Sequence, residues 1–260
     1  MKAVFKKCKL YYTMYGDKVL SKGLRIMSNI LTTEHLTKCY KNENVLKDIN
    51  LHVPKNEVYC LLGPNGAGKT TIMKILTGML SKTNGTVYFE NHIWNRKDLK
   101  NIGSLIENAP IYSNLTAKEN MEVVTLLRGA DSKQINTILK TVGLENTKRK
   151  LAKQFSLGMK ERLGIGLALI GNPKLIILDE PTNGLDPLGI QELRNLISKL
   201  KSKNITIIIS SHMLSEVEHL ADTIGILGNG KILLEQKYDH KTNLEEIFNS
   251  ILRKNGVLND

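Results

Sequence analysis

The 260-residue sequence has few cysteines and no long apolar run. Its three cysteines, Cys8, Cys39 and Cys60, show no metal-ligand spacing and form no even set, which argues against a disulfide framework and favours a reducing, cytosolic compartment. The longest apolar run, 163–171, is far too short to cross a bilayer. The hydrophobic share of 41% is ordinary for a globular protein, so the chain can bury a sizeable core.

The net charge of +12 is not matched by a basic patch in the body of the sequence. Residues 1–26 carry seven of the 37 Lys and Arg and one of the 25 acidic residues, which is half of the excess. The other half is spread along the remaining chain, as on a solvated surface. We therefore expect no nucleic-acid partner, and contact with anionic lipid stays an alternative.

The first 26 residues differ from the rest. They show neither a helical nor an alternating period, and they lack the apolar core and cleavage site of a secretory signal. Lys22 and Gly23 can be encoded by a purine-rich ribosome-binding sequence three codons before Met27. Our hypothesis is that the functional protein starts at Met27, with a targeting arm as the alternative.

Apolar periodicity predicts strands that alternate with helices. The expected strands are 30–40, 45–53, 58–63, 86–90, 174–178, 205–210 and a hairpin of 223–227 with 231–236. The expected helices are 70–80, 117–129, 132–143, 157–170, 188–201 and 244–254. This order predicts an α/β fold with a mostly parallel sheet, an antiparallel β subdomain near the N-terminus and an inserted helical subdomain at about 92–170. We divide the chain into an extension (1–26), one domain (27–240) and a C-terminal helix (241–260).

A glycine-rich loop, GPNGAGKTT, follows one of these strands and opens a helix. It matches G-x-x-x-x-G-K-[ST] in the strand-loop-helix context that the motif requires, which predicts a P-loop NTPase core. Its backbone N–H groups and the helix N-terminus would surround phosphates, Lys69 would add positive charge, and Thr70 would offer an oxygen to Mg²⁺. The predicted nucleotide-binding residues are Gly63, Pro64, Asn65, Gly66, Ala67, Gly68, Lys69, Thr70 and Thr71.

Two acids end the apolar strand LIILDE. Asp179 is placed to hold Mg²⁺, directly or through water, because this ion prefers hard oxygen ligands. Glu180 is placed to orient or deprotonate a water that attacks the γ-phosphate. Together with the phosphate loop, these acids predict a nucleoside-triphosphate hydrolase.

The stretch FSLGMKERLGIGLALIGNP, just before LIILDE, indicates which kind of hydrolase this is. Here the sequence resembles the ATP-binding cassette (ABC) family, whose signature is usually LSGGQ. The resemblance covers about 30–236 and includes the motif order: phosphate loop, central loop, signature, LDEPTNGLDP and SSH. It implies the ABC ATPase fold, with ATP and Mg²⁺ as cofactors. The signature departs from the family's form at Leu157 and Met159.

The resemblance also implies roles for single residues. Tyr40 matches the aromatic residue that stacks on adenine. Ser156 and Gly158 match signature residues that contact the γ-phosphate held by a second subunit. Asp186 matches the loop that crosses the dimer interface, and His212 matches a histidine that contacts the γ-phosphate.

Glu107 stands where the family usually has a glutamine that ends a strand and reaches Mg²⁺ and the attacking water. With LIE…Y…NLTAKEN and FSLGMKERLGI, it resembles the ATPases of bacterial exporters that give self-protection against lantibiotics and bacitracin-like peptides. An exporter of another drug or lipid is the alternative. We expect Glu107 to contribute to catalysis and to metal binding.

The sequence as a whole therefore predicts an ATP-hydrolysing subunit at the cytoplasmic face of the membrane. Its expected partners are a separate membrane permease and a second copy of the same chain. A rival of another class is an ABC ATPase that acts on ribosomes or DNA. Such proteins usually carry two cassettes or a long coiled coil, and this sequence has one cassette and no long coiled coil.

Overall fold

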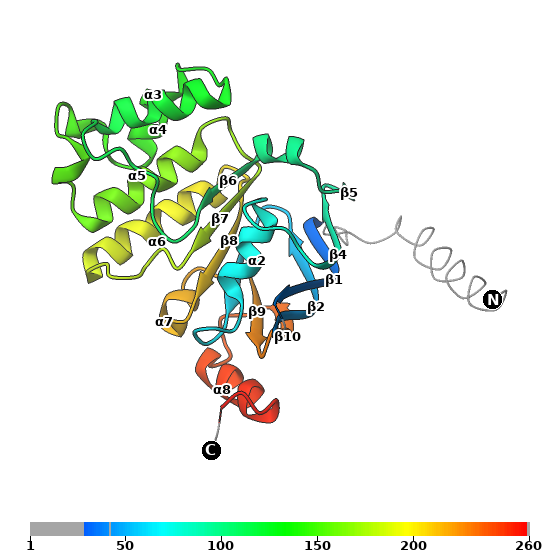
Figure 1. The fold of residues 1–260 in the computed structure, drawn as a ribbon. Helices are drawn as coiled ribbons and strands as arrows, with labels where there is room; N and C mark the ends of the chain where they lie inside the picture. The colour runs from blue at the N-terminus through cyan, green and yellow to red at the C-terminus, as the bar shows by residue number, and fades with distance from the viewer. Residues whose placement is uncertain (1–28, 42, 259–260) are drawn as a thin grey trace, which may run out of the picture.

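The structure, a computed structural model, describes residues 29–41 and 43–258 and contains two β-sheets (Figure 1). The predicted start at Met27 lies outside these residues. A six-stranded sheet has the order β10-β9-β3-β8-β7-β6, and a four-stranded sheet has the order β2-β1-β4-β5. The larger sheet contains β3 (Val58–Leu62), β6 (Ile102–Leu105), β7 (Leu175–Asp179), β8 (Thr206–Ser211), β9 (Thr223–Gly228) and β10 (Lys231–Lys237).

Five strands of the larger sheet run parallel, and β10 runs antiparallel to β9. The turn between β9 and β10 has positive φ at Asn229 (50°) and Gly230 (74°), which is the turn that a two-residue hairpin favours. The α/β class, the mostly parallel sheet and this hairpin are therefore confirmed.

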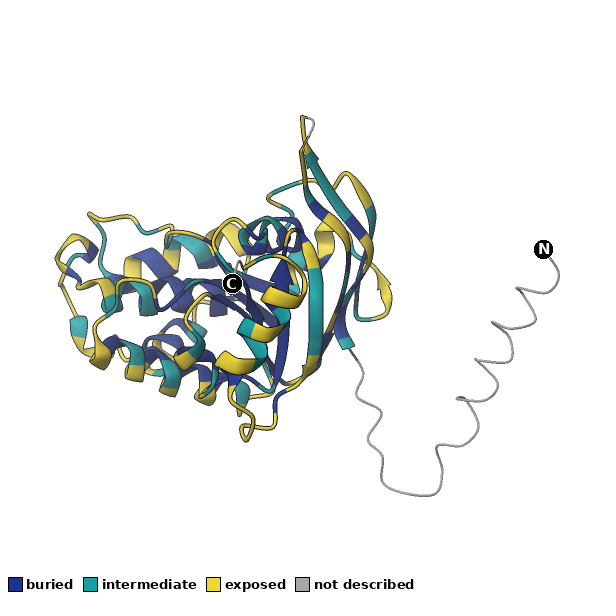
Figure 2. Ribbon diagram, turned by 90° about the horizontal axis from the view of Figure 1, so that it is seen from below, coloured by how far each residue is buried: buried dark blue, intermediate teal, exposed yellow. Residues whose placement is uncertain are grey.

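The central strands are buried on both faces, as an apolar run in a parallel sheet predicts. In β3, Cys60 and Leu62 belong to one core, while Tyr59 and Leu61 belong to another. Figure 2 shows these buried strands between the helices on one side and the four-stranded sheet on the other. The larger sheet is thus held from both sides, so the ends of its strands form a fixed platform for loops.

The four-stranded sheet is antiparallel and covers the second core together with α2. It contains β1 (Asn29–Tyr40), β2 (Glu43–Pro54), β4 (Asn84–Phe89) and β5 (His92–Ile93). In β1, Leu31 and Thr33 are buried and Thr32 between them is only partly buried. This is the antiparallel β arrangement that the alternating N-terminal pattern predicts.

The helices that follow the phosphate loop are α2 (Lys69–Leu76), α3 (Ala117–Arg128), α4 (Gln134–Thr141), α5 (Leu157–Leu169), α6 (Pro187–Lys201), α7 (Leu214–Val217) and α8 (Leu244–Lys254), with short 3-10 turns at Arg96–Asn101, Glu145–Thr147 and Ala152–Gln154. The segment 92–170 supplies α3, α4 and α5, which group together in Figure 1, and it also supplies β6 of the main sheet. The division of the chain at residue 240 stays a prediction. Among the described residues, no helix combines the length and apolar character needed to span a membrane.

The first helix is shorter than the expected 70–80, because α2 ends at Leu76. Gly78 has φ 69°, a left-handed conformation that stops a helix, and a Cβ at Gly78 would lie 2.9 Å from the Trp94 ring. The chain therefore turns away at Gly78 instead of adding another helical turn.

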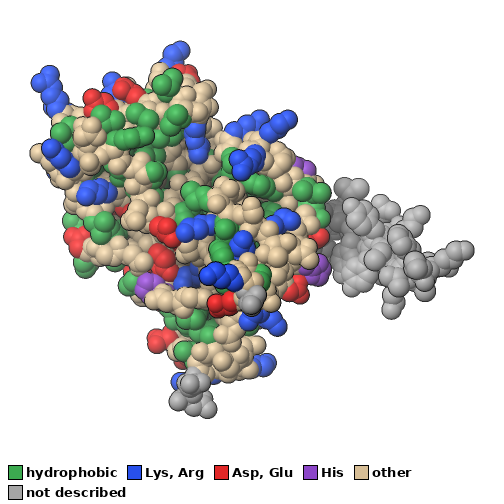
Figure 3. Space-filling model, viewed as in Figure 1, with side chains coloured by type: hydrophobic (Ala, Val, Ile, Leu, Met, Phe, Trp, Pro, Cys, Tyr) green, Lys and Arg blue, Asp and Glu red, His purple; other side chains and the backbone are tan. Residues whose placement is uncertain are grey.

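Lysine and arginine side chains are scattered over the face shown in Figure 3, among side chains of other types. In the described part of the chain, lysines and arginines also pair with acids, as Lys201 does with Asp222 and Arg194 does with Glu216. The charge of the described residues on this face is therefore dispersed, as its distribution in the sequence indicates.

Close packing of α5 on β6 generates a test of the fold. A Cβ at Gly103 in β6 would lie 2.1 Å from the carbonyl oxygen of Ala168 in α5. Gly103→Ala is therefore expected to lower the free energy of unfolding by about 2 kcal/mol, because a backbone oxygen cannot move aside without moving the helix. Urea denaturation measures this change.

The matched control is Gly158→Ala in α5, where a Cβ would lie 3.8 Å from its nearest neighbour. Alanine favours a helix over glycine, so this variant should be as stable as the original protein or more stable. If Gly103→Ala were as stable as the original protein, α5 would be able to move away from β6 without lowering the free energy of unfolding.

Candidate nucleotide site

The phosphate loop joins β3 to α2 and has a left-handed backbone at Gly66 (φ 80°) and Gly68 (φ 109°). A Cβ at Gly66 would have no atom within 4 Å, so the loop is open there. Gly68 is the N-cap of α2, and none of the described side chains caps it. The first N–H groups of the helix are therefore left for an external acceptor, which fits an anionic phosphate.

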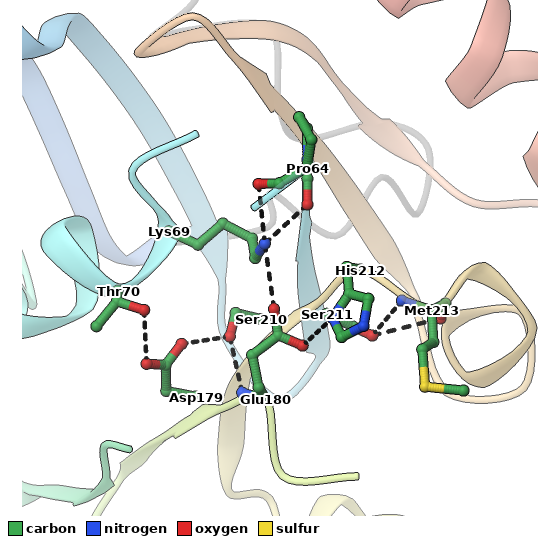
Figure 4. A network of polar contacts seen from close by, with 10 residues as sticks. Pro64, Lys69, Thr70, Asp179, Glu180, Ser210, Ser211, His212 and Met213 are labelled. Carbon is green, nitrogen blue, oxygen red and sulfur yellow. Dashed lines mark hydrogen bonds and ion pairs between the residues drawn. The ribbon is translucent and has the colours of Figure 1, made fainter. Parts of the chain in front are cut away.

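Lys69 directs its ammonium group back over this loop (Figure 4). Its Nζ donates to the carbonyl oxygens of Gly63 at 2.7 Å and Pro64 at 3.3 Å, and it lies 3.1 Å from Oε1 of Glu180. The Lys69 side chain is only 6% exposed. A buried cation with these replaceable acceptors is suited to phosphate oxygens.

Asp179 ends β7 between two hydroxyl groups. Thr70 Oγ1 donates to its Oδ2 at 2.8 Å, and Ser210 Oγ donates to its Oδ1 at 2.6 Å. The parallel register of β7 and β8 pairs Asp179 with Ser210. The sequence motif SSH contains Ser210, but its contact with Asp179 depends on two strands that are 31 residues apart. The sequence signal that could have indicated this contact is that both apolar strands, β7 and β8, end in polar residues.

Glu180 takes a left-handed backbone (φ 49°) directly after β7. Its N–H donates to Ser210 Oγ at 2.9 Å, and its carboxylate lies between Lys69 and His212. The distance from His212 Nδ1 to Glu180 Oε2 is 2.7 Å. Strained backbone of this kind persists where the surroundings over-determine it, and here Lys69 and His212 fix the carboxylate while Ser210 fixes the backbone N–H.

The oxygen atoms at this site fit Mg²⁺. Thr70 and Asp179 provide hard oxygens side by side, and among residues 29–41 and 43–258 no three His, Cys, Asp or Glu side chains gather into a metal cluster. Mg²⁺ usually takes one or two protein ligands together with water and substrate phosphates, so a sparse set of this kind matches its habit.

The signature residues lie apart from this cluster, at the starts of α5 and α6. Ser156 is the N-cap of α5 and accepts from the N–H of Met159 at 3.2 Å, so the helix starts normally although Leu157 replaces a glycine. Asp186 is the N-cap of α6 and accepts from the N–H of Gly189 at 2.9 Å. Gly158 faces this second cap, because a Cβ there would lie 3.9 Å from Gly189 Cα. The two caps therefore form a separate patch.

Tyr40 is the last residue of β1 and is 44% exposed. Lys38 Nζ lies 4.8 Å from the centre of its ring. The hairpin that follows Tyr40 contacts the phosphate loop, because a Cβ at Gly68 would lie 2.7 Å from Leu46 Cδ2. The exposed ring of Tyr40 therefore lies two residues along β1 from Lys38, which pairs with Leu46.

Glu107 is not part of the cluster around Asp179. Its Oε1 lies 2.6 Å from Lys74 Nζ on α2, and its side chain is 59% exposed. It follows β6 with a left-handed backbone (φ 61°). The pairing of Glu107 with Lys74 could not be inferred from the sequence, because it depends on how α2 packs against the sheet.

Glu161 lies on α5, the helix that starts at the signature residues, and its carboxyl group has a displaced pKa. Burial raises the pKa of its carboxyl from 4.5 to about 7. Near neutral pH, this side chain is therefore close to half-protonated.

Residues 46–183 match the family described as "ABC transporter". The chain belongs to the ABC transporter family. In this family and fold, the protein is an ATPase that binds ATP and couples its hydrolysis to transport.

Two similar relatives are transport ATP-binding proteins. The chain is 57% identical over 221 residues to the lantibiotic transport ATP-binding protein SrtF of Streptococcus pyogenes, covering 85% of this chain and 96% of SrtF. It is 48% identical over 219 residues to the bacitracin transport ATP-binding protein BcrA of Bacillus licheniformis, covering 82% of this chain and 72% of BcrA.

Solved ABC structures share the fold. The ADP conformation of the ATP-binding cassette MJ1267 has a TM-score of 0.76 at 27% identity and covers 88% of this chain and 96% of that one. The dimeric post-hydrolysis state of the cassette MJ0796, bound to ADP and phosphate, has a TM-score of 0.71 at 27% identity and covers 80% of this chain and 98% of that one. The expected ABC ATPase fold is confirmed.

Ser210 offers a direct test of the site. Ser210→Ala removes the hydrogen bond to Asp179 and the acceptor for the N–H of Glu180. Loss of such supporting groups usually costs about 10–100-fold in metal affinity or activity, so we expect a Mg²⁺-dependent ATPase rate lower by that factor. Ser211→Ala is the control, since Ser211 Oγ contacts the backbone of Met213 instead. Equal rates in the two variants would show that Ser210 does not support the site.

The displaced pKa of Glu161 predicts a pH effect on stability. Folding favours the protonated carboxyl, so its contribution to stability is complete below pH 4.5 and is lost as the pH rises through about 7. Glu161→Gln cannot ionise and should become more stable relative to the original protein between pH 5 and pH 8. Denaturation at both pH values measures the difference, and a constant difference would contradict the displaced pKa.

Proposed function

We propose that this protein is the ATP-hydrolysing subunit of an exporter that protects the cell against a lantibiotic or a bacitracin-like peptide. The observation that carries the proposal is the 57% identity to a lantibiotic transport ATP-binding protein along 96% of that protein. The 48% identity to a bacitracin transport ATP-binding protein also supports the proposal.

The proposed nucleotide site uses the cluster of Figure 4. Lys69 and the loop N–H groups bind the β- and γ-phosphates, and Thr70 and Asp179 hold Mg²⁺. When bound, Mg²⁺ would neutralise charge that develops on the phosphates. Glu180 accepts the proton of the attacking water, and His212 orients Glu180 and contacts the γ-phosphate.

The proposed active unit is a homodimer. The N-termini of α5 and α6 carry Ser156, Gly158 and Asp186 and lie apart from Lys69. These residues would therefore contact the nucleotide bound by a second copy. Tyr40 would stack on the adenine of the nucleotide in its own chain. The dimeric cassette with ADP and phosphate supports this arrangement.

The proposed partner is a membrane permease, which would hold the dimer at the cytoplasmic face of the membrane. The similar relatives are transport ATP-binding proteins, and a subunit of that kind acts on a separate transmembrane part. The loop from Asn108 to Leu115 is the part of this chain that would transmit nucleotide state to the permease. Closure on ATP and reopening after hydrolysis would shift the permease between its states.

Glu180→Gln tests the function in cells that carry the chain with its neighbouring permease genes. The variant should still bind MgATP and accumulate as a dimer, but it should hydrolyse ATP at a small fraction of the original rate, because the proton acceptor is lost. Tolerance of lantibiotics and bacitracin should fall to that of cells without the transporter.

Exposed Glu122→Gln on α3 is the control and should leave both ATPase rate and tolerance unchanged. If the original protein hydrolyses ATP but gives no tolerance of either peptide, the exporter carries another drug or lipid. Near-normal turnover by Glu180→Gln would remove Glu180 from its role.

A further inference from the structure

Three carboxylates reach the same edge of the main sheet, and each has its own partner. Asp179 and Glu180 end β7, and the parallel register of β6 with β7 pairs Leu105 with Leu178 and so brings Glu107 to a similar level. Glu180 is neutralised by Lys69, and Glu107 is neutralised by Lys74 of the same helix.

Lys74 lies one helical turn after Thr70 on α2. Side chains four residues apart lie on one face of a helix, so Lys74 and Thr70 face the same edge of the sheet. Thr70 contacts Asp179 while Lys74 contacts Glu107. Glu107 is therefore held on α2, beside the proposed metal ligands but outside their hydrogen-bonded cluster.

The ion pair is suited to exchange. Its side chains are 32% and 59% exposed, and exposed pairs of this kind are weak. A bound divalent cation is the largest local charge in such a site and prefers carboxylate oxygen to an ammonium partner.

We propose that Lys74 is a positioning residue that holds Glu107 on α2 until a divalent cation occupies Thr70 and Asp179, and that Glu107 then exchanges Lys74 for the metal side of the site. The inference rests on the proposed nucleotide site. It links metal occupancy to the loop after Glu107 through one change of ionic partner.

The test uses purified full-length protein and the non-hydrolysable analogue AMP-PNP. The dissociation constant of AMP-PNP is measured by calorimetry in EDTA and in Mg²⁺. The quantity compared is the dissociation constant in EDTA divided by the dissociation constant in Mg²⁺, called the Mg²⁺ ratio below. Lys74→Met leaves the Glu107 charge unpaired, which repels phosphates without metal and attracts the metal when it is present. The ratio should rise by roughly two- to fivefold, the range expected when an exposed ion pair no longer competes.

A double-mutant cycle identifies the partner. Glu107→Gln should lower the ratio, and adding Lys74→Met to Glu107→Gln should change it no further, because the charge on which Lys74 acts is gone. Lys74→Arg keeps the positive charge and should keep the ratio close to the original. Lys118→Met removes the exposed ion pair with Glu122 on α3 and is the matched control, with no expected change.

Hydrogen exchange gives a second readout, measured first without nucleotide and then with Mg²⁺ and AMP-PNP. Amides of residues 106–116 should exchange faster in Lys74→Met than in the original protein, and Mg²⁺ with AMP-PNP should change their exchange in the original protein. An unchanged Mg²⁺ ratio in Lys74→Met would overturn the proposal, even if exchange increased, because the pair would then be a surface contact only. If the ratio behaves as expected but the original protein gives cells no tolerance of either peptide, only the exporter function is contradicted.

Discussion

Strands β3, β7 and β8 run parallel and side by side, and their carboxyl ends meet at one edge of the sheet. From these ends come the phosphate loop, the two acids and the SSH segment, so residues more than a hundred positions apart come within hydrogen-bond distance. The hydrogen bonds of Ser210 to Asp179 and to the N–H of Glu180 depend on this register. A shift of β8 by a single residue would turn its side chains, Ser210 among them, to the other face and break both hydrogen bonds.

The sequence was sufficient for the parts of the site that are local. The phosphate loop lies within nine consecutive residues, and the acids lie at the end of one apolar strand, so pattern alone predicted their elements. Ser210 and Lys74 were missed because their partners are supplied by strand register and by helix packing. The end of α2 at Leu76 was missed for the same reason, since Gly78 lies against the Trp94 ring.

The signature patch shows how the fold can tolerate an unusual sequence. A glycine is expected where Leu157 stands, yet the helix still starts at that residue because Ser156 caps it. The Leu157 side chain is 49% exposed and approaches Gly184, where a Cβ would lie 3.0 Å from Leu157 Cδ2. Glycine at 184, with φ 74°, thus leaves room for the leucine. The substitution changes the surface that a second copy would meet, while the helix N-terminus is retained.

The Glu107 carboxylate changes the charge at the proposed metal edge, where a neutral amide would usually stand. Three carboxylates share this sheet edge, and without Lys74 the charge of Glu107 would be unpaired while the phosphates of ATP add further negative charge. Lys69 and Lys74 come from one helix, so the helix that presents its N-terminus to the phosphates also balances two of the three acids. Movement of α2 relative to the sheet would therefore alter both ion pairs together. A change of charge at the phosphate loop would therefore also act on the loop after Glu107, because α2 follows the first loop directly and is paired with Glu107 through Lys74.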